Sequence, residues 1–225
     1  ISPITINNNT IFSNNNTNGF TIWRDDTAGT SGRTDCFTMR IYATTTNYSL
    51  ETATNSALSG GWYHLCLVFS GSISGTDTLR GYINGIEDAN SPITAGVGDM
   101  KAQTTNLLIG APNTTASNIY MHGTMQEIAI WNKALTTNQV AQLYNSGKPN
   151  RGLPIMIAPT NLKAYWPMDE GVSGASANST IANVRDYSGN GNNGTASYGA
   201  NLTGCTWSTT QPSLNHPIGN LMGGD

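Results

Sequence analysis

The sequence predicts an all-β protein: an antiparallel β-sandwich with one short helix near residues 136–146 and extended terminal arms. Short apolar runs dominate the chain, and Gly, Asn, Asp, Ser and Pro separate them, which is typical of all-β domains. Asn84-Gly85 stands between two such runs and favours a tight hairpin, because both turn positions need a positive φ. A chain of 225 residues is long enough to fill the core of one sandwich.

The composition indicates a neutral, polar surface. Charged residues make up 10% of the chain, against about 25% in average proteins, and Asn, Thr, Ser and Gly replace them. The formal net charge is −3 and the Lys and Arg residues form no cluster, so nucleic acid is not an expected partner. No apolar run approaches the ~18 residues of a membrane span, so none is expected.

Several segments have the pattern of strands. Residues 60–72, GGWYHLCLVFSGS, give the strongest signal, because a run that is apolar on both faces suits a strand inside a sandwich. Residues 78–89 contain the Asn84-Gly85 hairpin. The remaining expected strands are 19–26, 36–43, 47–53, 106–113 and 123–135.

One helix is expected within residues 135–147, LTTNQVAQLYNSG. Thr136 or Thr137 is suited to cap its N-terminus, and Gly147 is suited to end it. Its apolar positions follow helical spacing: Val140, Leu143 and Tyr144. A helix of two to three turns is not stable alone, so it must pack on the sandwich.

The chain divides by composition into a sandwich and flanking segments. We expect the sandwich over 19–147, a proline-containing linker over 148–161, and arms over 1–18 and 201–225. The first residue is Ile1, with neither Met nor a signal peptide. This indicates either a processed protein or a piece of a longer one.

A series of motifs over residues 60–147 resembles a known family. A W-Y-H strand is followed by a hairpin ending in N-G, an L-I-G strand, the strand GTMQEIAIWNKAL and a helix ending in Y-N-S-G. In this order they resemble the second half of a laminin-G-like, pentraxin-related domain. The resemblance implies a concanavalin A-like jelly roll, an architecture that hosts enzymes, lectins and inert spacers.

The segment 162–200 is displaced relative to this resemblance. LKAYWPMDEG and DYSGNGNNG are similar to the family's first strand and first turn, which the family places before the other strands. The strand can complete its own sandwich, as in a circular permutation, or that of a neighbouring copy, because unpaired edges recruit strands. Alternatively, it opens a second domain of a tandem array. We favour completion, within the chain or between subunits, because half a sandwich would expose apolar strands.

Carboxylates are not arranged for catalysis. Glycanases of this fold place carboxylates at alternate positions of one strand, where the side chains share a face. Glu127 has Met125 and Ala129 at those positions. Glu87-Asp88 and Asp169-Glu170 are adjacent pairs, whose side chains point to opposite faces of a strand. We therefore expect no catalytic residues and no enzyme activity.

Calcium is the candidate cofactor, because many laminin-G-like and pentraxin-like sandwiches bind it at loop tips. A calcium ion takes six to eight oxygen ligands, and the candidates are Asp25, Asp26, Asp186, Asn190 and Asn192. The alternative for DYSGNGNNG is turn chemistry, because Asn and Gly tolerate positive φ. For Asp25 and Asp26 the alternative is a solvated loop.

Two tyrosines are candidate sugar-binding residues. Tyr120 and Tyr187 lie beside polar loop residues, where an exposed ring can stack on a pyranose. Core packing is the favoured role for Trp23 and Tyr82.

The three cysteines leave the redox state open. Cys36 and Cys66 would bridge if they lay on neighbouring strands, and Cys205 is the third thiol. The resemblance places a family cysteine near Cys66, but the match at Cys36 is loose.

Three functions compete. The first is a non-catalytic structural or adhesion module of an extracellular, virion-surface or cell-surface assembly, such as a phage or virus decoration or fibre protein. Its partners would be other subunits, in a homo-oligomer, capsid or filament, and also glycans. The second is a calcium-dependent carbohydrate-binding lectin domain, and the third is a glycoside hydrolase.

Overall fold

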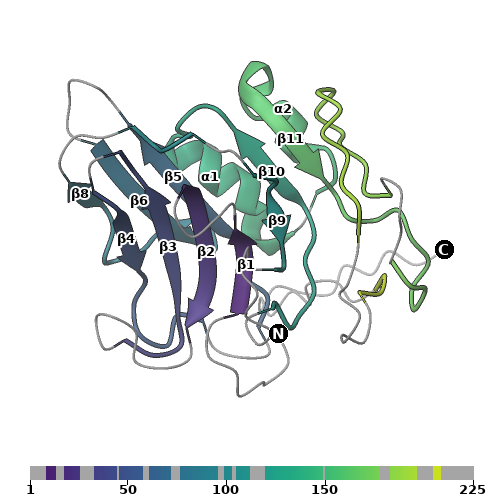
Figure 1. The fold of residues 1–225 in the computed structure, drawn as a ribbon, viewed down its shortest axis with the longest axis horizontal. Helices are drawn as coiled ribbons and strands as arrows, with labels where there is room; N and C mark the ends of the chain where they lie inside the picture. The colour runs from purple at the N-terminus through teal and green to yellow at the C-terminus, as the bar shows by residue number, and fades with distance from the viewer. Residues whose placement is uncertain are drawn as a thin grey trace.

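The structure is a computed structural model, and it confirms the all-β prediction (Figure 1). It describes residues 9–13, 18–25, 33–44, 46–57, 61–71, 77–95, 99–102, 105–111, 120–148, 150–177, 183–196 and 205–208. Two antiparallel sheets pack face to face, and a two-stranded sheet lies beside them.

The first sheet has five strands in the order β4-β3-β2-β1-β9. β2 (Gly19–Asp25) and β3 (Cys36–Tyr42) pair along their whole length. The other members are β1 (Asn9–Ser13), β4 (Tyr48–Glu51) and β9 (Leu108–Ile109). In Figure 1 strands β1 to β4 lie in front of the second sheet.

The second sheet is organised around β6 (Asp77–Ile83). β5 (Leu65–Ser70) pairs with it, as do the short strands β7 (Ile86–Glu87) and β8 (Ile93–Ala95). Asn84 and Gly85 join β6 to β7 with φ angles of 52° and 76°. Both values are positive, so the hairpin predicted from the sequence is confirmed.

The main core lies between the two sheets. The cross-strand register places Ile22 opposite Met39 and Met39 opposite Leu50, and all three pack against Leu79 of the second sheet. The sheets approach closely at Gly81, where an added Cβ would lie 2.6 Å from Leu50 Cδ2. A larger residue there would therefore force the two layers apart.

The predicted helix is confirmed as α1 (Thr137–Tyr144). Thr136 caps it in a capping box with Gln139, and Asn145 ends it in the left-handed conformation, before the expected Gly147. Val140 packs with Val68 and Tyr82 on the side of the second sheet away from the main core. A short 3-10 helix, η1 (Asn145–Gly147), follows.

Part of the expected N-terminal arm is a strand. β1 lies between β2 and β9, inside the five-stranded sheet rather than outside the fold. Ile11 and Phe12 pack against the main core. Asn and Thr surround them in the sequence, so the segment lacks the alternation of apolar and polar residues that would predict a strand. In the expected C-terminal arm the structure describes residues 205–208, where Thr206 forms an isolated bridge with Ser176.

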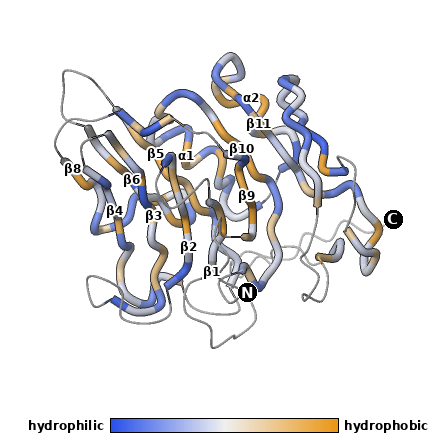
Figure 2. Tube along the Cα trace, in the orientation of Figure 1, coloured by the Kyte–Doolittle hydropathy of each residue, from blue (hydrophilic) through white to orange (hydrophobic). Residues whose placement is uncertain are grey.

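The displaced strand pairs within its own chain. β11 (Leu162–Trp166) is antiparallel to β10 (Ile128–Trp131), with Ile128 opposite Trp166. Ala164 and Trp166 join Ile128 in a separate apolar cluster. Figure 2 shows β9 and β10 as hydrophobic strands at this position.

Two short helices occupy the segment expected to be a linker. They are α2 (Leu153–Met156) and the 3-10 helix η2 (Pro159–Asn161). Ile157, just after α2, packs with the cluster that holds α1. Among the described residues, no helix is long and apolar enough to cross a membrane.

The cysteine bridge considered above is absent. Cys36 lies in β3 and Cys66 in β5, which belong to different sheets, and both thiols are free, as is Cys205. Burial raises the pKa of Cys36 to about 11, with a further contribution from Asp25, and burial raises that of Cys66 to about 12. Both groups are therefore neutral thiols at physiological pH.

Replacing Ala164 with Asp tests the apolar contact between β11 and the rest of the chain. Ala164 is 4% exposed, so the variant buries an unpaired carboxylate and loses about 3 kcal/mol or more of unfolding free energy. Lys163→Asp is the matched control, because Lys163 is the exposed neighbour in the same strand. Urea unfolding measures both variants, and equal losses would contradict the assigned faces of β11.

His64 gives the fold a pH dependence. Burial lowers the pKa of His64 to about 4, whereas the unfolded chain binds the proton near 6.5. The neutral ring therefore stabilises the fold fully above pH 6.5, and this contribution is lost as the pH falls toward 4. Between pH 7 and 4.5 the unsubstituted protein should lose about 2 to 3 kcal/mol more unfolding free energy than His64→Gln, as measured by urea unfolding. Parallel losses in the two proteins would contradict this assignment.

Candidate functional site

The five-stranded sheet presents a polar face on the side away from the main core. Alternate residues of a strand point to opposite faces, so the burial of Ile22, Met39 and Leu50 in the core directs their neighbours outward. Two cross-strand rows result from the register. One row is Ser13, Thr21, Arg40 and Ser49, and the other is Thr10, Trp23, Thr38 and Glu51. We call these eight residues the hydroxyl face; Thr10, Ser13, Thr21 and Thr38 are buried within it.

Arg40 and Trp23 form the centre of the hydroxyl face. The Arg40 guanidinium carbon lies 5.1 Å from the centroid of the Trp23 ring and 6.0 Å from that of Tyr42. Arg40 Nε donates a hydrogen bond of 2.6 Å to Ser49 Oγ. These contacts hold the guanidinium in place beside the aromatic rings.

Three buried hydroxyls on this face, those of Ser13, Thr21 and Thr38, lack hydrogen-bond partners among the described residues. Ser13 and Thr21 are opposite each other in the β1–β2 register and are only 1% and 6% exposed. In the part of the chain that the structure describes, neither hydroxyl oxygen has a hydrogen-bond partner. Such groups are uncommon in native proteins because each costs roughly 1–3 kcal/mol, so they call for an explanation. A polar molecule that reaches these enclosed groups would supply the missing hydrogen bonds.

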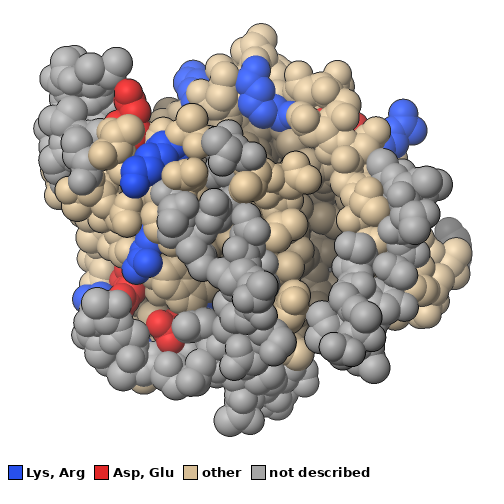
Figure 3. All heavy atoms as spheres, viewed as in Figure 1, with Lys and Arg blue, Asp and Glu red and all other residues tan. Residues whose placement is uncertain are grey.

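The charges on this side of the molecule are few. Figure 3 shows scattered Lys, Arg, Asp and Glu atoms, and most of the described surface carries none of them. This agrees with the neutral composition and favours recognition by hydrogen bonds over long-range electrostatic attraction.

The predicted calcium residues separate into two places. Asp186, Asn190 and Asn192 lie together in the loop 186–193, which we call the edge loop. Asp25 ends β2 in the five-stranded sheet, where it is buried and adds to the raised pKa of Cys36. Asp26 lies outside the described residues.

The Asp186 carboxylate organises the edge loop. Its Oδ1 accepts hydrogen bonds from the backbone N–H groups of Tyr165 and Ser188, at 2.9 and 2.8 Å. Its Oδ2 accepts from the N–H of Asn192 and the hydroxyl of Ser188, at 2.8 and 2.9 Å. Burial alone would raise the pKa of Asp186, but these hydrogen bonds outweigh it and lower the pKa below its usual value.

The edge loop covers the open side of β11. The Asn190 and Asn192 side-chain amides donate to the carbonyls of Leu162 and Lys163, at 2.9 and 2.8 Å. Tyr187 N–H donates to the carbonyl of Tyr165. Backbone groups that would otherwise recruit another strand are thereby paired. A cation at this loop would compete with these N–H donors for the Asp186 oxygens.

The two predicted sugar-binding tyrosines differ in their surroundings. The Tyr187 ring has the guanidinium carbons of Arg151 and Arg185 at 4.8 and 5.2 Å from its centroid. A sugar would have to displace a guanidinium to stack there. Tyr120 is partly exposed and follows residues 112–119, which lie outside the described part of the chain.

The structure couples Glu127 to residues distant in sequence. Tyr165 donates a hydrogen bond of 2.6 Å to Glu127 Oε2, and its oxygen accepts the Gly152 N–H at 2.9 Å. Burial raises the pKa of Glu127, and the charge of Asp169 contributes to the rise. Asp169 also pairs with Arg151 at 3.1 Å. Sequence spacing gave no signal for this grouping because its members lie on separate segments.

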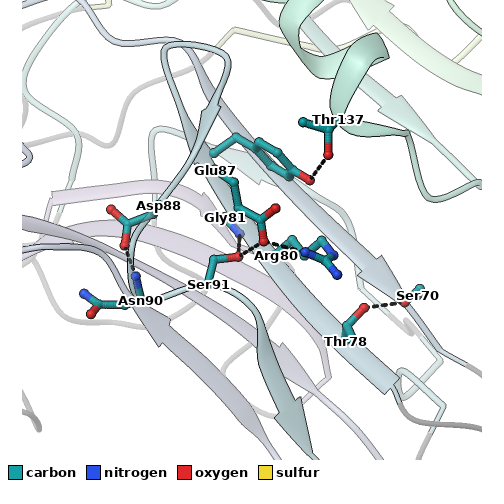
Figure 4. Close-up of polar contacts among 10 residues, drawn as sticks. Ser70, Thr78, Arg80, Gly81, Glu87, Asp88, Asn90, Ser91 and Thr137 are labelled. Atoms are coloured by element: carbon teal, nitrogen blue, oxygen red, sulfur yellow. Dashed lines mark hydrogen bonds and ion pairs between the residues drawn. The ribbon is translucent and has the colours of Figure 1, made fainter.

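A cavity of about 360 Å³ lies between β5, β6 and the start of α1. Its polar side chains have partners, either one another or residues just outside the cavity (Figure 4). Ser70 and Thr78 hydroxyls lie 2.6 Å apart, those of Tyr82 and Thr137 3.2 Å, and Arg80 pairs with Glu87 at 2.6 Å. These polar groups are already satisfied, so the hydroxyl face is the stronger candidate site.

Comparison with known proteins identifies the family. The model of the Laminin_G_3 family, described as the concanavalin A-like lectin/glucanases superfamily, matches residues 2–141. The chain therefore belongs to this family. A search of curated proteins found no significant match.

One solved structure shares the fold. It comes from Bacteroides ovatus and is described as a "putative carbohydrate binding protein"; it has 21% sequence identity to this chain and a TM-score of 0.60. The match covers 95% of this chain and 53% of the other, so this chain spans about half the length of that protein.

Substitution of Asp186 tests its structural role. Asp186→Asn keeps the shape but loses the charge and one acceptor oxygen, so we expect a loss of about 1 to 3 kcal/mol at pH 7. The folded-state pKa is lowered, so the contribution is present above pH 3.8 and is lost as the pH falls below it. Asp169→Asn is the control, because its ion pair with Arg151 is exposed to solvent and should contribute little to stability.

Urea unfolding at pH 7 and at low pH measures both variants. A D186N protein as stable as the control at pH 7 would contradict the role of the edge loop. Millimolar calcium gives a second readout: a rise in Tm that D186N lacks would place a cation at this loop.

Proposed function

We propose that this chain is a non-catalytic carbohydrate-binding module and that its ligand binds on the hydroxyl face. The observation that carries the proposal is the pair of buried hydroxyls, Ser13 and Thr21, without partners among the described residues. Membership of a family that includes lectins supports it, as does the description of the structural neighbour as a carbohydrate binding protein.

The chemistry of the hydroxyl face suits a sugar. A sugar ring carries several hydroxyls that both donate and accept, and Ser and Thr hydroxyls do the same. Trp23 lies beside them, and its ring carries the Arg40 guanidinium at 5.1 Å, so its role is to position that group. Binding would therefore relieve unsatisfied hydrogen bonds.

The arrangement of carboxylates supports binding without catalysis. A glycoside hydrolase needs two carboxyl groups that flank the scissile bond. Glu127 is hydrogen-bonded to Tyr165, and Asp169 is paired with Arg151. These contacts give both groups a structural role.

Two finer predictions stay proposals. A calcium-dependent lectin would use Asp186, Asn190 and Asn192, which the edge loop brings together, and the calcium titration above tests it. A role in an extracellular, virion-surface or cell-surface assembly rests on the neutral composition, and light scattering at working concentration tests it.

Thr21→Val separates binding from folding. Removing a buried hydroxyl without a partner should leave the Tm unchanged or raise it, because valine has nearly the same shape. Its affinity for a glycan found on a broad glycan array should fall about tenfold, the equivalent of one hydrogen bond of roughly 1.4 kcal/mol. Trp23→Ala should weaken the same binding further.

Thr94→Val is the matched control, since Thr94 is exposed on β8 in the other sheet. This variant should change neither the Tm nor the affinity for the glycan. An array without any bound glycan would contradict the proposed function. Binding that T21V and W23A leave intact would contradict the assignment to the hydroxyl face.

A further inference from the structure

We propose that the hydroxyl face selects saccharides that carry a carboxylate, and that Arg40 binds this group. The inference rests on the proposed function, because it names the class of sugar that the same site takes. It starts from a charge that the fold leaves without a counter-ion.

Three other arginines of the described chain have carboxylate partners. Arg24 pairs with Asp35, Arg80 with Glu87 at 2.6 Å, and Arg151 with Asp169 at 3.1 Å. Arg40 is half-buried, and within the described residues no carboxylate pairs with it. A charge that has lost part of its water without gaining a counter-ion is unfavourable unless a ligand supplies one.

The geometry of Arg40 leaves donors available. Its Nε donates a hydrogen bond to Ser49 Oγ, and Trp23 and Tyr42 flank the guanidinium. Among the described residues the two Nη groups have no hydrogen-bond partner, so their N–H groups can bind a carboxylate in the bidentate manner typical of arginine. The aromatic contacts already hold the guanidinium in place, so it loses less conformational entropy when a ligand binds.

Adjacent members of the row across the sheet match the dimensions of one sugar ring. Ser13, Thr21 and Arg40 are successive cross-strand neighbours on β1, β2 and β3. Neighbouring strands lie about 4.8 Å apart, so a hydroxyl and a charge on adjacent strands are within the span of a single pyranose. A uronic acid presents ring hydroxyls toward one end and its carboxylate toward the other.

The experiment measures binding of the full chain to matched acidic and neutral polymers in physiological salt. The probes are polygalacturonate, alginate and hyaluronan, each beside its carboxyl-reduced form, with dextran sulfate and dextran as the sulfate pair. We expect at least one carboxylated polymer to bind at least about tenfold more tightly than its reduced form. A factor of this size corresponds to one charge-assisted hydrogen bond between Arg40 and the ligand carboxylate. Dextran sulfate should not reproduce that preference.

Variants assign the preference to one residue. Arg40→Gln should remove it, and Arg40→Lys should restore part of it, because lysine keeps the charge but not the bidentate geometry. Arg80→Gln is the matched control, a half-exposed arginine of the second sheet. Thr21→Val should weaken the acidic and reduced forms by the same factor. Thermal melting checks that each variant is folded.

The outcomes separate this inference from the proposed function. Equal affinity for acidic and reduced polymers, with T21V weakening both, would overturn the carboxylate preference and leave glycan binding intact. A preference that R40Q retains would overturn the role of Arg40. A preference that dextran sulfate shares would overturn the selection for a carboxylate. Binding to none of the polymers, acidic or neutral, would overturn the inference and count against the proposed function as well.

Discussion

The pairing of β2 with β3 is the constraint on which both the fold and the candidate site depend. Seven consecutive residues of each strand are in register, from Gly19 opposite Tyr42 to Asp25 opposite Cys36. Because side chains alternate between faces, burying Ile22 and Met39 in the core places Thr21 and Arg40 on the opposite face. A slip of one residue would turn the core side chains outward and the hydroxyl face inward. The hydroxyl face is thus a consequence of how the core is filled.

The second constraint is the open edge of β11. β10 pairs with one side of this strand, and the other side would present bare backbone groups. The edge loop satisfies them with side-chain amides and a single carboxylate, Asp186. Residues that suggested a metal site from their type therefore have a structural task in this conformation. The same oxygen and nitrogen chemistry serves turns and cation sites, so residue type alone does not separate the two.

Stability and binding oppose each other on the hydroxyl face. Unsatisfied buried hydroxyls lower the stability of the free protein, and valine at the same positions would avoid that loss. Proteins tolerate such groups where function uses them, since binding sites are commonly built at some expense of stability. The cavity beside α1 shows the contrary arrangement, because Ser70, Thr78 and Arg80 already have partners. This contrast is the reason for placing the ligand on the five-stranded sheet.

The sequence by itself determined the local elements. The Asn84-Gly85 turn, the Thr136 cap of α1 and the apolar strands follow from short-range rules, because each needs interactions within a few residues. The tertiary structure alone decided that β1 lies inside the sheet, that β11 pairs with β10, and that Glu127 contacts Tyr165. It also decided the site: Ser13, Thr21 and Arg40 are neighbours only because three strands pair in one register. Such pairings join residues far apart in the chain, and no local pattern of residue types specifies which strands will meet.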